Sequence, residues 1–214
     1  MKHERLHALA DGIFAIAMTL LVLELRVPEI NGATNAELLQ ALKELLPSLY
    51  SFILSFFLLF IYWRGFNAVI GTLAKTLSST LVLYSAVFLL FISLVPFSSY
   101  FFGRYSSTQV GVAMYAANLV LIGVMMHVIR RHIVNSPDVE VADHWTQRDH
   151  RNATIRVVVP ILSSLIAVAI SFKSTKVAGL LLLSNVALNV FNRSFDPIYY
   201  MLDKLSIGVN NEQK

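Results

Sequence analysis

Long apolar runs alternate with short polar segments along the whole chain. A bilayer core about 30 Å thick needs roughly 20 apolar residues in a helix, and somewhat shorter runs suffice in places. Six runs approach that length, at about residues 9–25, 49–66, 77–99, 110–129, 157–172 and 177–192. Because the runs are continuous rather than alternating, they favour helices over a barrel. The pattern predicts an all-α integral membrane protein with six transmembrane helices.

Two stretches lie outside the predicted spans. Thr34 or Asn35 can cap a short helix over about residues 35–46, with Glu37 in its first turn. Its leucines share one face: Leu38, Leu39, Leu42, Leu45 and Leu46. We therefore expect an amphipathic outer helix that lies on lipid or on a neighbouring subunit. Residues 130–154 are charged and predict a loop; with no internal repeat, residues 1–214 are expected to form a single domain.

Composition supports the membrane interpretation. Of the 214 residues, 56% are hydrophobic and 14% charged, and the mean hydropathy is +0.65. A soluble domain carries about 25% charged residues, so the composition excludes an ordinary soluble enzyme and a disordered chain. The chain has no cysteine, which removes disulfides, thiolate metal sites and cysteine nucleophiles from consideration.

The net charge of +4 would suggest a nucleic-acid partner in a soluble protein, but in a membrane protein the location of the charges matters more. If the amino terminus is cytoplasmic, twelve basic residues lie inside: Lys2, Arg5, Arg64, Lys75, Arg130, Arg131, Arg148, Arg151, Arg156, Arg193, Lys204 and Lys214. Five lie outside: Arg26, Lys43, Arg104, Lys173 and Lys176. Since Lys and Arg stay preferentially in cytoplasmic loops, both termini are predicted to be cytoplasmic, and no nucleic-acid partner is expected.

The first run also resembles a signal peptide loosely, with basic residues before an apolar stretch. Small residues of the A-x-A kind do not follow it, and Glu24 and Arg26 stand there instead. We therefore expect the first run to remain as a transmembrane helix.

Candidate catalytic and metal-binding residues are few. His144 and His150 neighbour Asp143 and Asp149, but a spacing of six residues matches no helical face, and a solvated loop explains them. His127 lies near the inner end of a span, where an interfacial or hydrogen-bonded role is expected. No phosphate-binding loop or nucleophile elbow is present in the sequence. We expect no enzyme, no metal site and no cofactor.

Two stripes on the predicted helices are distinctive, one polar and one apolar. Asn185, Asn189 and Asn192 share one face of the last span, where they either bond to other helices or line an aqueous vestibule. On the first span, Ile16, Leu20 and Leu23 fall on one line, with Thr19 beside it, at about 100° per residue.

Asp11 lies on the other side of the first span. A charged residue at that depth is expected to contact protein rather than lipid, so it favours an anchor inside the subunit. The apolar line either packs in the bundle core or faces elsewhere.

The sequence RLHALADGIFAIAMTLLVLEL at residues 5–25 resembles the first helix of the transmembrane protein 175 family of potassium channels. That family carries R-x-x-x-F-S-D, then D-G-[VI]-[FL]-A-I, T-L-L-V-L-E and V-P. Arg5 and Asp11 match, whereas Leu9 and Ala10 replace Phe and Ser. Further similar segments are LPS at 46–48, IYW at 61–63 and FLLFISLVPF at 88–97.

The resemblance implies a prokaryotic homotetramer in which the first helices of four subunits line a pore. It implies that Ile16, Leu20 and Leu23, with Thr19 beside them, form the constriction, and that Arg5 and Asp11 belong to a structural network. Glu24 either attracts cations at the outer mouth or pairs with Arg26. The implied partners are the chain itself, membrane lipids and permeant K⁺ or other monovalent cations.

The resemblance further implies a multi-pass protein of the prokaryotic plasma membrane. Relatives often have His after the second-helix Trp and Asn in the third helix. In those regions this chain has RGFN at residues 64–67 and Ser85. These departures indicate a divergent channel. The competing class is a membrane protein that is not a channel, either a small-solute transporter or a scaffold whose first helix only packs.

Overall fold

The computed structural model describes residues 3–27, 34–141 and 147–190, with backbone alone at 147–153, 156 and 185–190. This part of the chain is all-α, as predicted, apart from one isolated bridge between Ala74 and Val141. The α-helices are α1 (His3–Leu20), α2 (Asn35–Glu44), α3 (Leu46–Phe66), α4 (Ser79–Ser93), α5 (Val95–Tyr105), α6 (Gln109–Asn135), α7 (Gln147–Ser171) and α8 (Thr175–Val190). A 3₁₀ turn, η1 (Leu21–Glu24), continues α1, and a π-helix, η2 (Asn67–Leu73), continues α3.

Within the described residues, four stretches are long and apolar enough to cross a membrane: His3–Glu24, Leu46–Leu73, Ser79–Tyr105 and Gln109–Asn135. They coincide with the first four predicted spans. The last two predicted spans fall on the shorter apolar stretches Val157–Ser171 and Thr175–Ser184. The count of six transmembrane helices therefore stays a prediction.

Two boundaries differ from the sequence prediction for clear physical reasons. The third predicted span divides into α4 and α5 at Leu94, because Pro96 lacks an amide hydrogen and fits only the first turn of a new helix. The predicted loop at 130–154 is largely helical, since α6 continues to Asn135 and α7 already begins at Gln147. Charge alone does not separate a loop from a polar helix, because Arg and Gln also favour helices.

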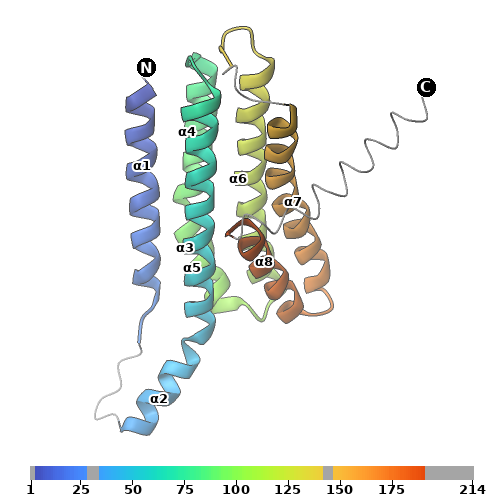
Figure 1. Ribbon diagram of the computed structural model, residues 1–214. Coiled ribbons are helices and arrows are strands. Elements are labelled where there is room, and N and C mark those ends of the chain that lie inside the picture. The colour runs from blue at the N-terminus through green and yellow to red at the C-terminus, as the bar shows by residue number, and fades with distance from the viewer. Residues whose placement is uncertain (1–2, 28–33, 142–146, 191–214) are drawn as a thin grey trace, which may run out of the picture.

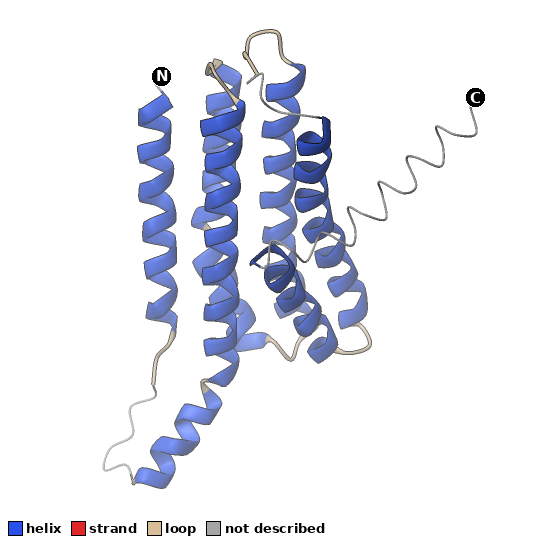
Figure 2. Ribbon diagram, in the orientation of Figure 1, coloured by secondary structure: helices blue, strands red, loops and turns tan. Residues whose placement is uncertain are grey.

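The helices run up and down as a bundle, with α1 along the α3 and α4 side and α7 and α8 on the other (Figure 1). Figure 2 shows the same arrangement coloured by secondary structure, with helices as the dominant element. On α6, Gly123 permits the close approach of α7, because an added Cβ would meet Ile161 Cγ1 at 2.6 Å.

The outer helix α2 projects beyond the end of the bundle (Figure 1). Thr34 and Glu37 form a capping box at its start: each side chain accepts a hydrogen bond from the other residue's backbone amide. Leu38, Leu39 and Leu42 are exposed on it. This placement agrees with the amphipathic helix expected from the sequence.

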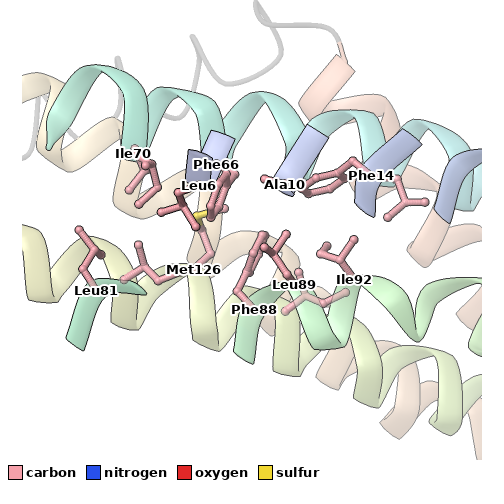
Figure 3. Close-up of a cluster of buried hydrophobic side chains, with 14 of the residues drawn as sticks. Leu6, Ala10, Phe14, Phe66, Ile70, Leu81, Phe88, Leu89, Ile92 and Met126 are labelled. Carbon is pink, nitrogen blue, oxygen red and sulfur yellow. The ribbon is translucent and has the colours of Figure 1, made fainter. Parts of the chain in front are cut away.

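The larger hydrophobic core joins α1, α3, η2, α4 and α6, and Figure 3 shows its central residues. At its centre the rings of Phe66 and Phe88 stack with centroids 5.3 Å apart. Helix α1 and the first residue of η1 contribute buried residues three or four positions apart: Leu6, Ala10, Phe14, Ala17 and Leu21. This spacing is that of one helical face, so α1 attaches to the bundle along a single stripe.

Candidate functional site

Helix α1 buries one face and leaves the opposite apolar face uncovered. The exposed fractions are 60% for Ile16, 42% for Leu20 and 58% for Leu23, and Thr19 beside them is also exposed. The sequence left open whether this line packs in the bundle core, and these exposures exclude that arrangement within one subunit. An apolar line of this kind needs lipid, a second protein chain or a narrow pore opposite it.

The end of α1 tightens into the 3₁₀ turn η1, which the sequence pattern did not predict. In a 3₁₀ helix, side chains three residues apart eclipse each other, so Leu23 stands in line with Leu20. By the same geometry Glu24 stands in line with Leu21, which is buried, and Glu24 itself is half-buried. The turn thus brings the two leucines close to one line.

Thr19 directs its hydroxyl to the backbone of its own helix. Its Oγ1 donates to the carbonyls of Ala15 at 3.0 Å and Ile16 at 2.9 Å. Such bonds compete with the helical ladder and bend a helix locally. In this conformation the hydroxyl hydrogen of Thr19 stays on the backbone of its own helix.

Two polar contacts tie the first turns of α1 to the second predicted span. The indole Nε1 of Trp63 on α3 donates to Asp11 Oδ1 at 2.7 Å, and the His7 ring contacts Asn67 Oδ1 at the start of η2 through Nδ1 at 3.0 Å. Asp11 contacts its own subunit but is exposed, so the carboxylate lies at the edge of the α1–α3 contact rather than inside it.

His7 did not stand out in the sequence; it lies before the first predicted span but one helical turn from Asp11 on α1. Arg5 is exposed and has no hydrogen-bond partner among the described residues. At the outer end, Arg26 Nε donates to the Leu23 carbonyl at 3.2 Å.

For most of the remaining candidate residues the structure gives no side-chain contacts. Asp143 and His144 lie outside the described residues, and for Asp149 and His150 only the backbone is described. The same limit applies to Asn185 and Asn189, while Asn192 lies outside the described residues. In the described ranges, no three His, Asp or Glu side chains are grouped as metal ligands would be. His127 is partly buried on α6.

Comparison with known proteins points to one family. Residues 5–96 match the family model described as endosomal/lysosomal potassium channel TMEM175. A protein of Chamaesiphon minutus named as a potassium channel is 28% identical over 131 residues, 60% of this chain and 64% of that protein. A potassium channel of a Chryseobacterium species is 33% identical over 135 residues, 63% of this chain and 66% of its own length. The matches thus span slightly under two thirds of these relatives.

Solved structures of the same family share the fold. The crystal structure of a lysosomal potassium-selective channel TMEM175 homolog from Chamaesiphon minutus superposes with a TM-score of 0.74 at 23% identity, over 89% of this chain and 97% of that one. A variant of the potassium channel MtTMEM175, in complex with a nanobody fusion protein, gives a TM-score of 0.56 at 17% identity, over 90% of this chain and 93% of that one.

Proposed function

Since the chain belongs to the TMEM175 family, we propose that it forms a potassium-permeable cation channel whose pore is lined by α1 of each of four subunits. The observation that carries the proposal is the uncovered line of Ile16, Leu20 and Leu23 on a helix whose other face is buried. This helix lies within the region that matches the family, and the relatives are named potassium channels.

A single α1 encloses nothing, so the proposed pore requires copies of the chain around a common axis. Cyclic symmetry places the same residue of each copy at the same height. The line on α1 then becomes three stacked apolar rings, of Ile16, Leu20 and Leu23. The η1 turn supports this arrangement because it brings Leu20 and Leu23 close to one line on the uncovered face.

Ion selection in such a pore comes from dehydration. An apolar ring closes a pore by dewetting, and a narrow open ring makes an ion shed part of its water shell. K⁺ holds its water less tightly than Na⁺ and passes at a lower cost. Thr19 donates its hydroxyl hydrogen to its own backbone, and its oxygen keeps lone pairs that can accept from water or contact a cation beside the rings. The permeant ion is the only small partner that this mechanism requires.

The membrane placement follows from the charges. Both termini lie in the cytoplasm of a prokaryotic cell, and six spans cross its plasma membrane. Glu24 then lies near the outer mouth, where its carboxylate raises the local cation concentration, although η1 places it in line with buried Leu21 rather than on the rings. Membrane lipids cover the outward apolar faces.

Purified protein in liposomes tests the proposal. Wild type should pass K⁺ faster than Na⁺, and Ile16→Asn or Leu23→Ala should lower that ratio about tenfold, because a wider or wetter ring demands less dehydration. Leu90→Ala on α4 is the matched control, since Leu90 is equally exposed but lies on another helix. An unchanged ratio in both ring variants would remove these residues from the constriction.

A transporter or scaffold is the competing function, and stoichiometry separates it from the channel. Four copies of the chain in mild detergent support the pore. A stable monomer, together with absent K⁺ flux, would overturn it.

A further inference from the structure

Helix α3 continues into an unusual element beyond the second predicted span. Residues Asn67–Leu73 form the π-helix η2, in which the Ala74 amide donates to the Val69 carbonyl five residues earlier, at 3.2 Å. Segments of π-helix are rare and are frequently found at functional sites. Val69, Ile70 and Leu73 are buried in the larger core, so η2 packs against its neighbours and does not fray.

The exposed side of η2 receives a side chain of α1. The carbonyl oxygen of the Asn67 amide can only accept, so His7 Nδ1 is the donor of their 3.0 Å hydrogen bond. One turn along η2, a Cβ added at Gly71 would meet His7 Cε1 at 3.2 Å and Nε2 at 3.3 Å. Asn67 and Gly71 therefore form a seat for the His7 ring, and a side chain at residue 71 would narrow that seat.

The residues that follow η2 are hydrogen-bonded to the segment that follows α6. The Lys75 amide donates to the Glu140 carbonyl at 2.8 Å, and the Glu140 amide donates to Thr76 Oγ1 at 3.0 Å. Beside these bonds, Ala74 and Val141 form the isolated bridge. Since this loop joins α6 and α7, η2 is fixed to the body of the subunit on one side and holds α1 on the other.

We propose that His7 is a positioning residue for the pore: η2 seats its ring through Asn67 and Gly71, and this seat fixes the amino-terminal end of α1. The inference rests on the proposed function, because α1 is the helix that carries the apolar rings. His7 lies nine residues before Ile16, so its ring never meets the permeant ion. It acts on the balance between closed and open arrangements of α1.

Gly71→Ala tests the seat directly, with Gly65→Ala as the matched control. The control adds the same methyl group to the same span, where it meets only Met126 Cε at 3.8 Å. In planar bilayers, Gly71→Ala should change the open probability about threefold or more. It should leave the single-channel conductance and the K⁺/Na⁺ ratio unchanged. Gly65→Ala should change none of them.

The variant His7→Ala tests whether Gly71→Ala changes the open probability by displacing the imidazole ring of His7. In that background the further change Gly71→Ala should have no effect on open probability, because the group it displaces is gone. An equal effect of Gly71→Ala with and without His7 would overturn the inference. So would a change in conductance or K⁺/Na⁺ ratio that matches the change in open probability.

Thermal unfolding of the detergent-solubilised protein gives a second readout that needs no conduction. Gly71→Ala should melt about 2–4 °C below Gly65→Ala, and the difference should vanish when His7 is Ala. If wild type passes no K⁺, the proposed function fails and the pore-positioning role fails with it, whatever the melting series gives. If wild type conducts and the melting difference persists without His7, the inference alone fails.

Discussion

At the residue scale, α1 is attached by a minimal set of contacts. Small and large apolar residues alternate on its buried stripe, and Ala10 and Ala17 let the helix approach its neighbours closely. Polar contacts to the second span come only from the first turns among the described residues, through His7 and Asp11. The carboxyl-terminal half of α1 and the η1 turn, which carry Ile16, Leu20 and Leu23, contact the rest of the described subunit through apolar packing. Such packing allows small displacements that a hydrogen bond resists.

The contact between Trp63 and Asp11 gives a residue-scale prediction. Trp63→Phe keeps an aromatic ring but removes the donor to the carboxylate, which should destabilise the protein by about 0.5–1 kcal/mol after allowance for the exposure of Asp11. Thermal unfolding in detergent measures the loss. In an Asp11→Asn background the same substitution should cost less, since a charge-assisted bond becomes a neutral one. Equal losses in both backgrounds would show that ring packing, and not the hydrogen bond, is responsible.

At the element scale, the lengths of the apolar runs were enough to predict where the first four long helices lie. They did not predict where the backbone departs from a regular α-helix. The first four runs of the sequence coincide with the four long apolar stretches of the structure. The 3₁₀ turn η1 and the π-helix η2 depart from 3.6-residue periodicity, and no single residue type marks such a departure. The seat of His7 also escaped prediction, because it depends on a glycine and an asparagine of a distant helix.

The outer helix α2 gives an element-scale prediction on pH. The carboxyl of Glu37 accepts hydrogen bonds from the Thr34 amide at 2.8 Å and the Thr34 hydroxyl at 2.9 Å. These bonds favour the ionised form and lower the pKa of Glu37 from its usual value of 4.5. The capping box is therefore complete above pH 4.5 and is lost as the pH falls through the lowered pKa.

Amide hydrogen exchange of α2 checks this expectation. Corrected for the intrinsic pH dependence of exchange, protection of the Glu37 and Leu38 amides should decline as the pH is lowered from about 6 to about 3. In Glu37→Gln, which carries no titrating group at this position, protection should be independent of pH over the same range. A decline of equal size in both proteins would show that the carboxyl of Glu37 does not control the first turn.

At the scale of the whole molecule, the subunit has two different sides. Helices α6, α7 and α8 pack closely together, whereas α1 lies at the edge of the bundle with one face uncovered (Figure 1). A soluble monomer would bury that face. A membrane protein can leave such a face for lipid, for a partner chain or for a pore. From the sequence, the stripe and the family resemblance could be found, but which face the subunit leaves open required the packing of α1 against α3 and α4.

The assembly gives a prediction at the same scale. Native mass spectrometry of the protein in mild detergent should give four times the 23.9 kDa mass of the chain. Ile16→Asn should retain that mass, because it changes the lining of the pore and not the faces that join subunits. Dissociation to monomers in Ile16→Asn alone would place this residue between subunits rather than on the axis.

The central claim is that ions pass along the uncovered line of α1, and thiol modification of a working channel tests it most directly. The chain has no cysteine, so Leu23→Cys creates a single reactive site, and Leu90→Cys on α4 provides an equally exposed site away from the proposed pore. A charged methanethiosulfonate reagent should reduce K⁺ flux through Leu23→Cys liposomes about tenfold or more, because a fixed charge in a narrow apolar ring opposes cation passage. It should leave Leu90→Cys and wild type unchanged. Complete modification of Leu23→Cys, verified by mass spectrometry, with undiminished K⁺ flux would contradict the account.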